Sequence, residues 1–268
     1  MSRNSGSIGR GTVDLEAARG YEDSQFYPSD QIVEGIPTYV RHNFIKKVYS
    51  ILAVQLIVTA AIAVPFALYP EKFVGPKTVA LVYLSVFLTL GIMIAIMCAP
   101  SIMRKYPTNY IVLTIFTAAE GFMVGIITSR YDINSILLAV GIVAIVVMGL
   151  TAYAFQTKHD FTGMGPYLFV ATLVLALFGL LFLFFGSTPV LHKVYAGIGA
   201  LIFSLYLVHD TQLIAGGKHN KYSFSLDDYC FAAMSLYIDI IQLFMRSLVH
   251  GRMWLMFSYI LSLVGSER

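Results

Sequence analysis

The sequence predicts an all-α polytopic membrane protein with seven transmembrane helices, the seventh at the centre of the bundle. Hydrophobic residues make up 57% of the 268 residues and charged residues only 12%. An average soluble domain is about 45–50% apolar and about 25% charged. Marking every charged residue and histidine leaves seven apolar windows long enough to cross a hydrocarbon core of about 30 Å. Lipid offers no hydrogen-bond partner, so each window must satisfy its own backbone as a helix.

The seven windows follow one another with short loops between them. They are Val48 to Tyr69, a segment within Thr78 to Met103, Tyr106 to Ser129, Ile133 to Thr157, a segment within Phe161 to Leu191, Val194 to Gly217, and Tyr229 to about Val249. We therefore expect a transmembrane domain over residues 44–250. The run from Met253 to Val264 is too short to span, so residues 251–268 are expected to form a short apolar tail that is interfacial or re-entrant.

The first 43 residues differ in composition from the rest. They are rich in Ser and Gly and hold six of the fifteen acidic residues, a composition typical of disorder. Lys and Arg residues near the span ends number eight on the side of this tail and six on the other. This asymmetry favours a disordered tail in the cytosol.

The remaining composition excludes several classes of protein. The net charge is +3 and the basic residues are scattered, so no nucleic-acid partner is expected. Cys98 and Cys230 lie in or beside apolar stretches and indicate small buried side chains rather than a disulfide framework. No spacing of Cys and His resembles a zinc site. We expect no cofactor, and a lipid bilayer as the main partner.

Three acidic residues interrupt otherwise apolar spans: Glu120, Asp210 and Asp239. An ionisable group inside a membrane is costly and marks a functional site by default. The alternative is a protonated acid that only joins helices through hydrogen bonds. Gly121, beside Glu120, suggests close helix packing there. His209 adjoins Asp210 and titrates in the physiological range.

Asp239 belongs to a polar stripe along the seventh span. Ser235, Asp239, Gln242 and Arg246 recur at spacings of four, three and four residues, so they share one helix face. A polar face is not expected to meet lipid, which places this helix centrally, with the stripe toward other helices or a water-filled path.

Asp210 and Asp239 flank the same loop, at depths of about 9 Å and about 15 Å by the rise per residue. If they meet, they share one proton and form a pH sensor. When protonated the pair would hold two helices together, and when ionised it would separate them or attract a cation. The oxygen ligands of Asp210 and Asp239 would suit Ca²⁺.

The residues around both aspartates resemble a known family. The sequences FSLYLVHDTQ over 203–212, DDY over 227–229 and AAMSLYIDIIQLF over 232–244 are similar to the signature of the transmembrane Bax inhibitor motif family (Bax inhibitor-1 family), Lifeguard branch. The similarity of span pattern extends over about residues 40–250.

The resemblance implies a fold of six helices around a central seventh, in a protein that leaks Ca²⁺ from internal stores and suppresses cell death. It assigns the family's di-aspartyl pH sensor to Asp210 and Asp239. A family arginine at the end of the second span falls near Arg104, one position out of register. Glu120 and Gly121 match a pair in eukaryotic members. Together with Ser235, Gln242 and Arg246, these residues are expected to support a polar path. Endoplasmic reticulum or Golgi membranes are implied, with the plasma membrane as another location.

Two alternatives remain open at this point. A scaffold that binds cell-death regulatory proteins without conducting ions would need the same membrane fold. An intramembrane aspartyl protease would also place two aspartates on neighbouring helices. Such proteases resemble one another in a Gly-x-Gly-Asp motif, whereas Asp239 follows Leu-Tyr-Ile, and no Pro-Ala-Leu segment is present. We therefore predict that the protein is not an enzyme.

Overall fold

The structure is a computed structural model that describes residues 32–33, 36–73, 75–186, 188–216 and 220–266. Its helices are α2 (Thr38–Leu68), α3 (Pro70–Phe73), α4 (Pro76–Cys98), α5 (Thr108–Thr128), α6 (Ile133–Gln156), α7 (Gly165–Phe185), α8 (Pro189–Ala215) and α9 (Tyr229–Ser266). Short 3-10 helices η2 (Pro100–Met103), η3 (Thr162–Met164) and η4 (Leu226–Asp228) lie in the connections, and strands β1 (Ile32–Val33) and β2 (Ile36–Pro37) pair ahead of α2. The predicted disorder of the tail falls mainly on residues 1–31, outside the described residues.

Seven of these helices are long and apolar enough to cross a membrane, which confirms the predicted fold class. They are α2, α4, α5, α6, α7, α8 and α9, and each overlaps one predicted window. Large apolar side chains cover the outside of the bundle, for example Phe87 at 71% and Phe184 at 76% exposure. Apolar side chains on the outer surface are what a lipid environment requires.

The first span begins earlier than its apolar window suggested. Helix α2 starts at Thr38, ten residues ahead of Val48 and six ahead of the expected domain boundary at residue 44. Its first turns are held by tertiary contacts, since Arg41 and Phe44 are both buried. Hydropathy could not mark this start, because the turns that carry Arg41 and Lys46 pack on protein rather than lipid.

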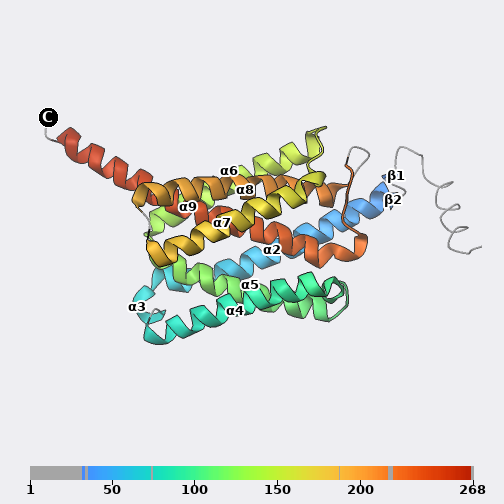
Figure 1. Ribbon diagram of the computed structural model, residues 1–268, viewed down its shortest axis with the longest axis horizontal. Coiled ribbons are helices and arrows are strands. Elements are labelled where there is room, and N and C mark those ends of the chain that lie inside the picture. The colour runs from blue at the N-terminus through green and yellow to red at the C-terminus, as the bar shows by residue number, and fades with distance from the viewer. Residues whose placement is uncertain (1–31, 34–35, 74, 187, 217–219, 267–268) are drawn as a thin grey trace, which may run out of the picture.

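The last helix extends further than predicted. Helix α9 continues through Ser266, so residues 251–266 continue the helix of the seventh span, whose apolar part ends at Leu248. Figure 1 shows this end of α9 projecting beyond the other helices.

Helix α9 occupies the centre of the bundle, as predicted. It contacts α8, α6, α2 and α5, and Figure 1 shows it between the α6–α8 group and the α2–α5 pair. Half of its most apolar window is buried, compared with 11% for the window in α7. The Ala232, Ala233 and Leu236 side chains of α9 are completely or almost completely buried.

Close packing of α2 on α5 depends on two glycines. A Cβ atom at Gly121 would lie 3.3 Å from Thr59 Cα, and one at Gly125 would lie 3.3 Å from Ala63 Cα and 2.8 Å from the Phe66 ring. Small residues at a four-residue spacing let two helix backbones approach in this way. The close helix approach inferred from Gly121 is therefore confirmed. Both α2 and α5 also contact the central helix α9.

Asp132 provides a test of the local structure at the start of α6. Its carboxylate accepts hydrogen bonds from Ser135 Oγ at 2.7 Å and from Ser135 N at 2.9 Å, and these bonds hold the pKa of Asp132 below its ordinary value. Asp132→Ala is expected to lower the free energy of unfolding by about 1 kcal/mol. A depressed folded-state pKa gives stability that is present above the unfolded pKa and is lost as pH falls through the folded pKa.

Thermal unfolding of the detergent-purified protein, followed by size-exclusion chromatography, measures this effect. The difference in stability between the wild type and Asp132→Ala should be largest at neutral pH and should become smaller in acid. Asp132→Asn is the matched control, because asparagine caps a helix about as well as aspartate without titrating. A wild-type advantage over Asp132→Ala that stays constant into acid would contradict the assignment.

The central position of α9 predicts which side chains meet lipid. Leu243 of α9 is only 3% exposed, so it does not serve as a lipid-facing reference, and Leu137 of α6, which is 63% exposed, takes that role. Single cysteines at 235 and 242, in a background with the exposed Cys98 replaced, should react with a membrane-dissolved probe several-fold more slowly than a cysteine at 137. Equal rates at all three positions would place the stripe on the bundle surface.

Candidate functional site

Asp210 and Asp239 lie on the two helices that flank the loop from residue 216 to 228. Asp210 is near the end of α8 and is 7% exposed, and Asp239 is near the middle of the span in α9 and is 3% exposed. The two carboxyls are close enough for their charges to interact. The structure thus brings together the two acids that sequence spacing placed on neighbouring helices.

The direct partner of Asp210 is its neighbour His209. His209 Nδ1 lies 2.7 Å from Asp210 Oδ1, and both side chains are about 10% exposed. A carboxyl-to-carboxyl hydrogen bond is not found among the described residues. Instead, Asp239 Oδ2 is buried without a hydrogen-bond partner. The site is therefore a group of three titratable side chains rather than an isolated pair.

The second nitrogen of His209 faces the start of another helix. A Cβ atom built at Gly165, the first residue of α7, would lie 3.4 Å from His209 Nε2. The ring also meets Tyr206 edge to face, with centroids 6.4 Å apart. These contacts hold the imidazole between α8 and α7, with one nitrogen directed to Asp210. A change in the charge of His209 would act on both helices.

The polar stripe of α9 faces two different neighbours. Arg246 lies over the ring of Tyr195 on α8, with its guanidinium carbon 5.0 Å from the ring centroid, and packs against Gly199. Gln242 instead lines a cavity between α4, α5 and α9. Asp239 is the buried member of the stripe, and Ser235, Gln242 and Arg246 are half-buried, so the stripe contributes to two sites rather than to one continuous path.

A polar network fixes the end of α8 that carries Asp210. The side chain of Gln212 accepts from Phe161 N at 2.7 Å and donates to His159 O at 2.8 Å. Asp160 accepts from Lys221 N at 2.9 Å and from Thr162. Although partial burial favours the protonated acid, these hydrogen bonds outweigh it and hold the pKa of Asp160 below its ordinary value.

Arg41 of α2 closes the same end of the bundle. It is 2% exposed, and it donates from Nη1 to Phe224 O at 3.0 Å and from Nη2 to Ser223 Oγ at 3.2 Å. Lys47, six residues further along α2, lies over the ring of Tyr229, with its Nζ 3.2 Å from the ring centroid. Helix α2 thus clamps the α8–α9 loop and the start of α9.

Arg104 lies outside the polar stripe. Its guanidinium donates to both carboxylate oxygens of Asp228, at 2.6 and 3.2 Å, and its side chain is 51% exposed. Asp228 raises the pKa of the Arg104 guanidinium above its ordinary value. Arg104 therefore joins the connection after α4 to the start of α9, and it does not reach the buried aspartates.

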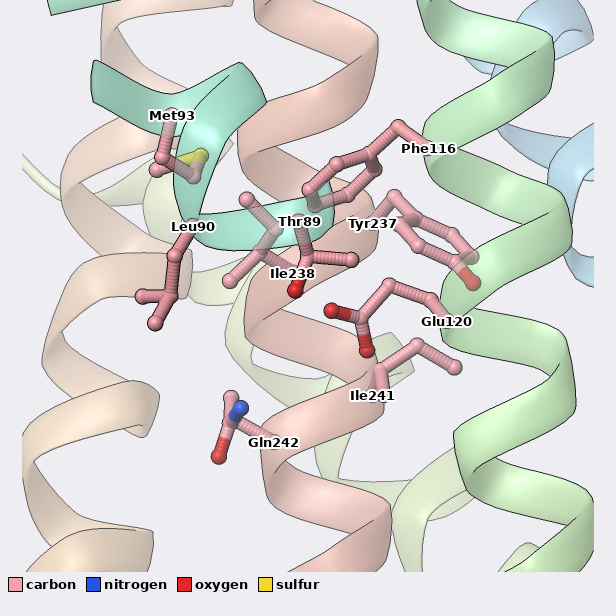
Figure 2. A pocket seen from close by; sticks show the side chains of 9 residues that line it. All are labelled: Thr89, Leu90, Met93, Phe116, Glu120, Tyr237, Ile238, Ile241 and Gln242. Atoms are coloured by element: carbon pink, nitrogen blue, oxygen red, sulfur yellow. The ribbon is translucent and has the colours of Figure 1, made fainter. Parts of the chain in front are cut away.

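Glu120 occupies a separate place in the bundle. Its side chain lines a cavity of about 160 Å³ together with Thr89 of α4 and Gln242 of α9. Figure 2 shows the Glu120 carboxylate directed from α5 into this cavity. Among the residues that the structure describes, no three His, Cys, Asp or Glu side chains are arranged to hold a metal ion. Neither acidic site therefore supplies three such side chains among the described residues.

The comparisons with known proteins match this architecture. Residues 41–250 match a family model described as "Inhibitor of apoptosis-promoting Bax1". The match begins at the buried Arg41 and includes all seven spans and both aspartates. The chain belongs to this family.

Lifeguard proteins are among its relatives. The chain is 37% identical over 231 residues to Protein lifeguard 3 of Homo sapiens, covering 84% of this chain and 74% of the human protein. It is also 37% identical to Protein lifeguard 3 of Mus musculus over 233 residues, covering 85% and 70%. It is 35% identical to Protein LIFEGUARD 4 of Arabidopsis thaliana over 246 residues, covering 88% and 93%. This lifeguard-family chain is thus an integral, multi-pass membrane protein in a family implicated in opposing apoptosis.

The structure adds three side chains to the sites expected from the sequence. His209 was singled out beside Asp210 but was not included in the expected sensor. Arg41 is one of the basic residues counted near the span ends, and the sequence carries no signal that it is buried. Thr89 is a polar residue within an apolar span, and this is the only sequence signal for its place beside Glu120.

Proposed function

We propose that this lifeguard-family protein is a pH-sensitive Ca²⁺ leak channel of internal membranes that lowers stored calcium and thereby suppresses cell death. The observation that supports this proposal is the enclosed group formed by His209, Asp210 and Asp239 on adjacent helices. Three titratable groups in the interior of a membrane protein are costly to maintain. A role in sensing protons or passing cations accounts for them better than helix cohesion alone.

The electrostatics of the group suggest how it responds to pH. Asp239 has a buried oxygen without a partner, so ionising it beside Asp210 places two like charges in a low dielectric. When one proton is retained, the two helices stay together. When both carboxyls ionise, their repulsion separates α8 from α9 or draws a cation between them. Ca²⁺ suits carboxylate oxygens, which it binds with carbonyl and water oxygens.

The purified protein in liposomes tests the proposal. Ca²⁺ entry into vesicles that contain an indicator should exceed entry into protein-free vesicles, and it should rise as pH increases through the range in which the group titrates. Flux equal to that of empty vesicles at every pH would remove the channel and favour the scaffold that binds cell-death regulatory proteins. Flux without pH dependence would support the leak channel and contradict the pH sensor.

Orientation decides which compartment the group senses. The balance of Lys and Arg predicts that residues 1–43 and the loop from 218 to 228 face the cytosol. Protease added to sealed organelles should therefore remove an amino-terminal tag completely, while a tag in the connection between α7 and α8 stays protected. Protection of the amino-terminal tag would reverse the orientation, and the sensor would then read the lumen.

A further inference from the structure

The cavity that holds Glu120 lies on a different face of α9 from the aspartate group. It is about 160 Å³ in volume and is lined by α4, α5 and α9, with Ile238 and Gln242 of α9 in its wall. Successive residues of a helix are about 100° apart, so Asp239 is turned well away from Ile238. The cavity is therefore centred on a different part of the α9 surface from Asp239, although Gln242 at its edge lies only about 60° around the helix from that residue.

Three oxygen-bearing side chains from three helices line this cavity. Figure 2 shows the Glu120 carboxylate directed toward Thr89, with Gln242 further along α9. Thr89 Oγ1 donates to Val86 O at 3.1 Å, which leaves its lone pairs available. Tyr237 contributes its ring, because its hydroxyl bonds Thr59 Oγ1 at 2.7 Å. No Lys, Arg or His lines the cavity within the described part of the chain.

The environment of Glu120 does not fit a role as helix adhesive. An acid that joins helices donates to an acceptor on its neighbour, yet neither carboxyl oxygen of Glu120 has a hydrogen-bond partner among the described residues. Glu120 is twelve residues into α5, which places it about 18 Å along the helix, near the middle of the membrane. A carboxylate at this depth needs a counter-charge, and the described wall supplies none.

We propose that this cavity is a weak Ca²⁺ site, with the Glu120 carboxylate as its charged ligand and the Gln242 carboxamide and Thr89 hydroxyl oxygens as neutral ligands. The proposal deepens the proposed function by naming a place where the permeating ion rests. Ca²⁺ takes six to eight oxygens, so bound waters complete its shell. A single carboxylate gives weak binding, which suits an ion that must also leave.

Equilibrium binding to the full-length protein in detergent tests the site without requiring transport. Terbium(III) replaces Ca²⁺ at oxygen sites, and the ring of Tyr237 in the cavity wall can sensitise its luminescence. Ca²⁺ should displace terbium(III) from the wild type. Glu120→Gln should weaken Ca²⁺ competition by about tenfold or more, because ligand charge sets affinity at such sites. Glu71→Gln is the matched control, since Glu71 is an exposed acid on α3.

A gain-of-function variant keeps the test decisive if Glu120→Gln does not fold. Gln242→Glu adds a second carboxylate to the same cavity and should tighten Ca²⁺ binding by about tenfold. Unchanged Ca²⁺ affinity in Gln242→Glu and in any folded Glu120→Gln protein would overturn the site. Liposome flux with the same proteins separates the two proposals. Ca²⁺ binding that depends on Glu120, without any flux, would contradict the channel and support the Ca²⁺ site. Flux together with unaltered Ca²⁺ binding in both variants would contradict only the site.

Discussion

Replacing Asp239 with asparagine is expected to abolish most of the pH dependence of Ca²⁺ flux while the protein still folds. Asparagine keeps a similar volume but cannot ionise, so Asp210 and residue 239 no longer titrate together. The ratio of flux at about pH 8 to flux at about pH 6, a range that brackets histidine titration, should fall close to one. Asp210→Asn should have the same effect, because either variant leaves a single carboxyl.

Flux through reconstituted vesicles of each variant measures this effect. Asp227→Asn is the matched control, since Asp227 is exposed in the adjoining loop and its loss should leave the profile unchanged. A variant that keeps flux and loses pH dependence identifies a sensor, whereas loss of flux at every pH identifies a ligand for the ion. Wild-type pH dependence in both variants would leave helix cohesion as the role of these acids.

The second large effect is expected from His209→Phe, which keeps an aromatic ring against Tyr206 and removes the nitrogen 2.7 Å from Asp210. Whether neutral or charged, an imidazole that donates to Asp210 stabilises its carboxylate form. Without this donor, ionisation requires a higher pH. The midpoint of the flux profile should therefore move upward by about one pH unit, which corresponds to about 1.4 kcal/mol.

The groups around His209 determine how this result is interpreted. Asp210 and Tyr206 face it from α8, Gly165 faces it from α7, and Asp239 approaches Asp210 from α9. His159→Phe is the control, because His159 is an exposed histidine at the same end of the bundle. A midpoint that moves equally in both variants, or in neither, would remove His209 from the sensing group.

Much of the fold could be predicted because lipid imposes a simple rule. Each span had to be a helix of sufficient length, and the polar stripe containing Asp239 required α9 to be enclosed. The element ends were less predictable. Hydropathy cannot detect that Arg41 is buried by contacts with residues 223 and 224, and it does not distinguish the continuing helix after residue 250 from a separate apolar tail.

The candidate sites show a similar division. The distances of Asp210 and Asp239 from the loop that joins their helices predicted that the two acids lie near each other, because helices joined by a short loop pack side by side. Spacing along one helix could not show that Gln242 and Asp239 serve different neighbours. That distinction depends on where α4 and α8 lie around α9, which is a property of the tertiary structure. The position of Arg104 after the second span likewise does not indicate that Asp228 is its partner.

The titration of the two buried carboxyls in the membrane tests most directly whether Asp210 and Asp239 share a proton. Infrared spectra of the protein in lipid, recorded across pH, report the C=O stretch of protonated carboxyl groups. If the two acids share a proton, this band should titrate in the wild type and should shift its midpoint in both Asp210→Asn and Asp239→Asn, because each acid changes the titration of the other. Bands that titrate independently, with each variant removing one and leaving the other unchanged, would contradict a shared proton.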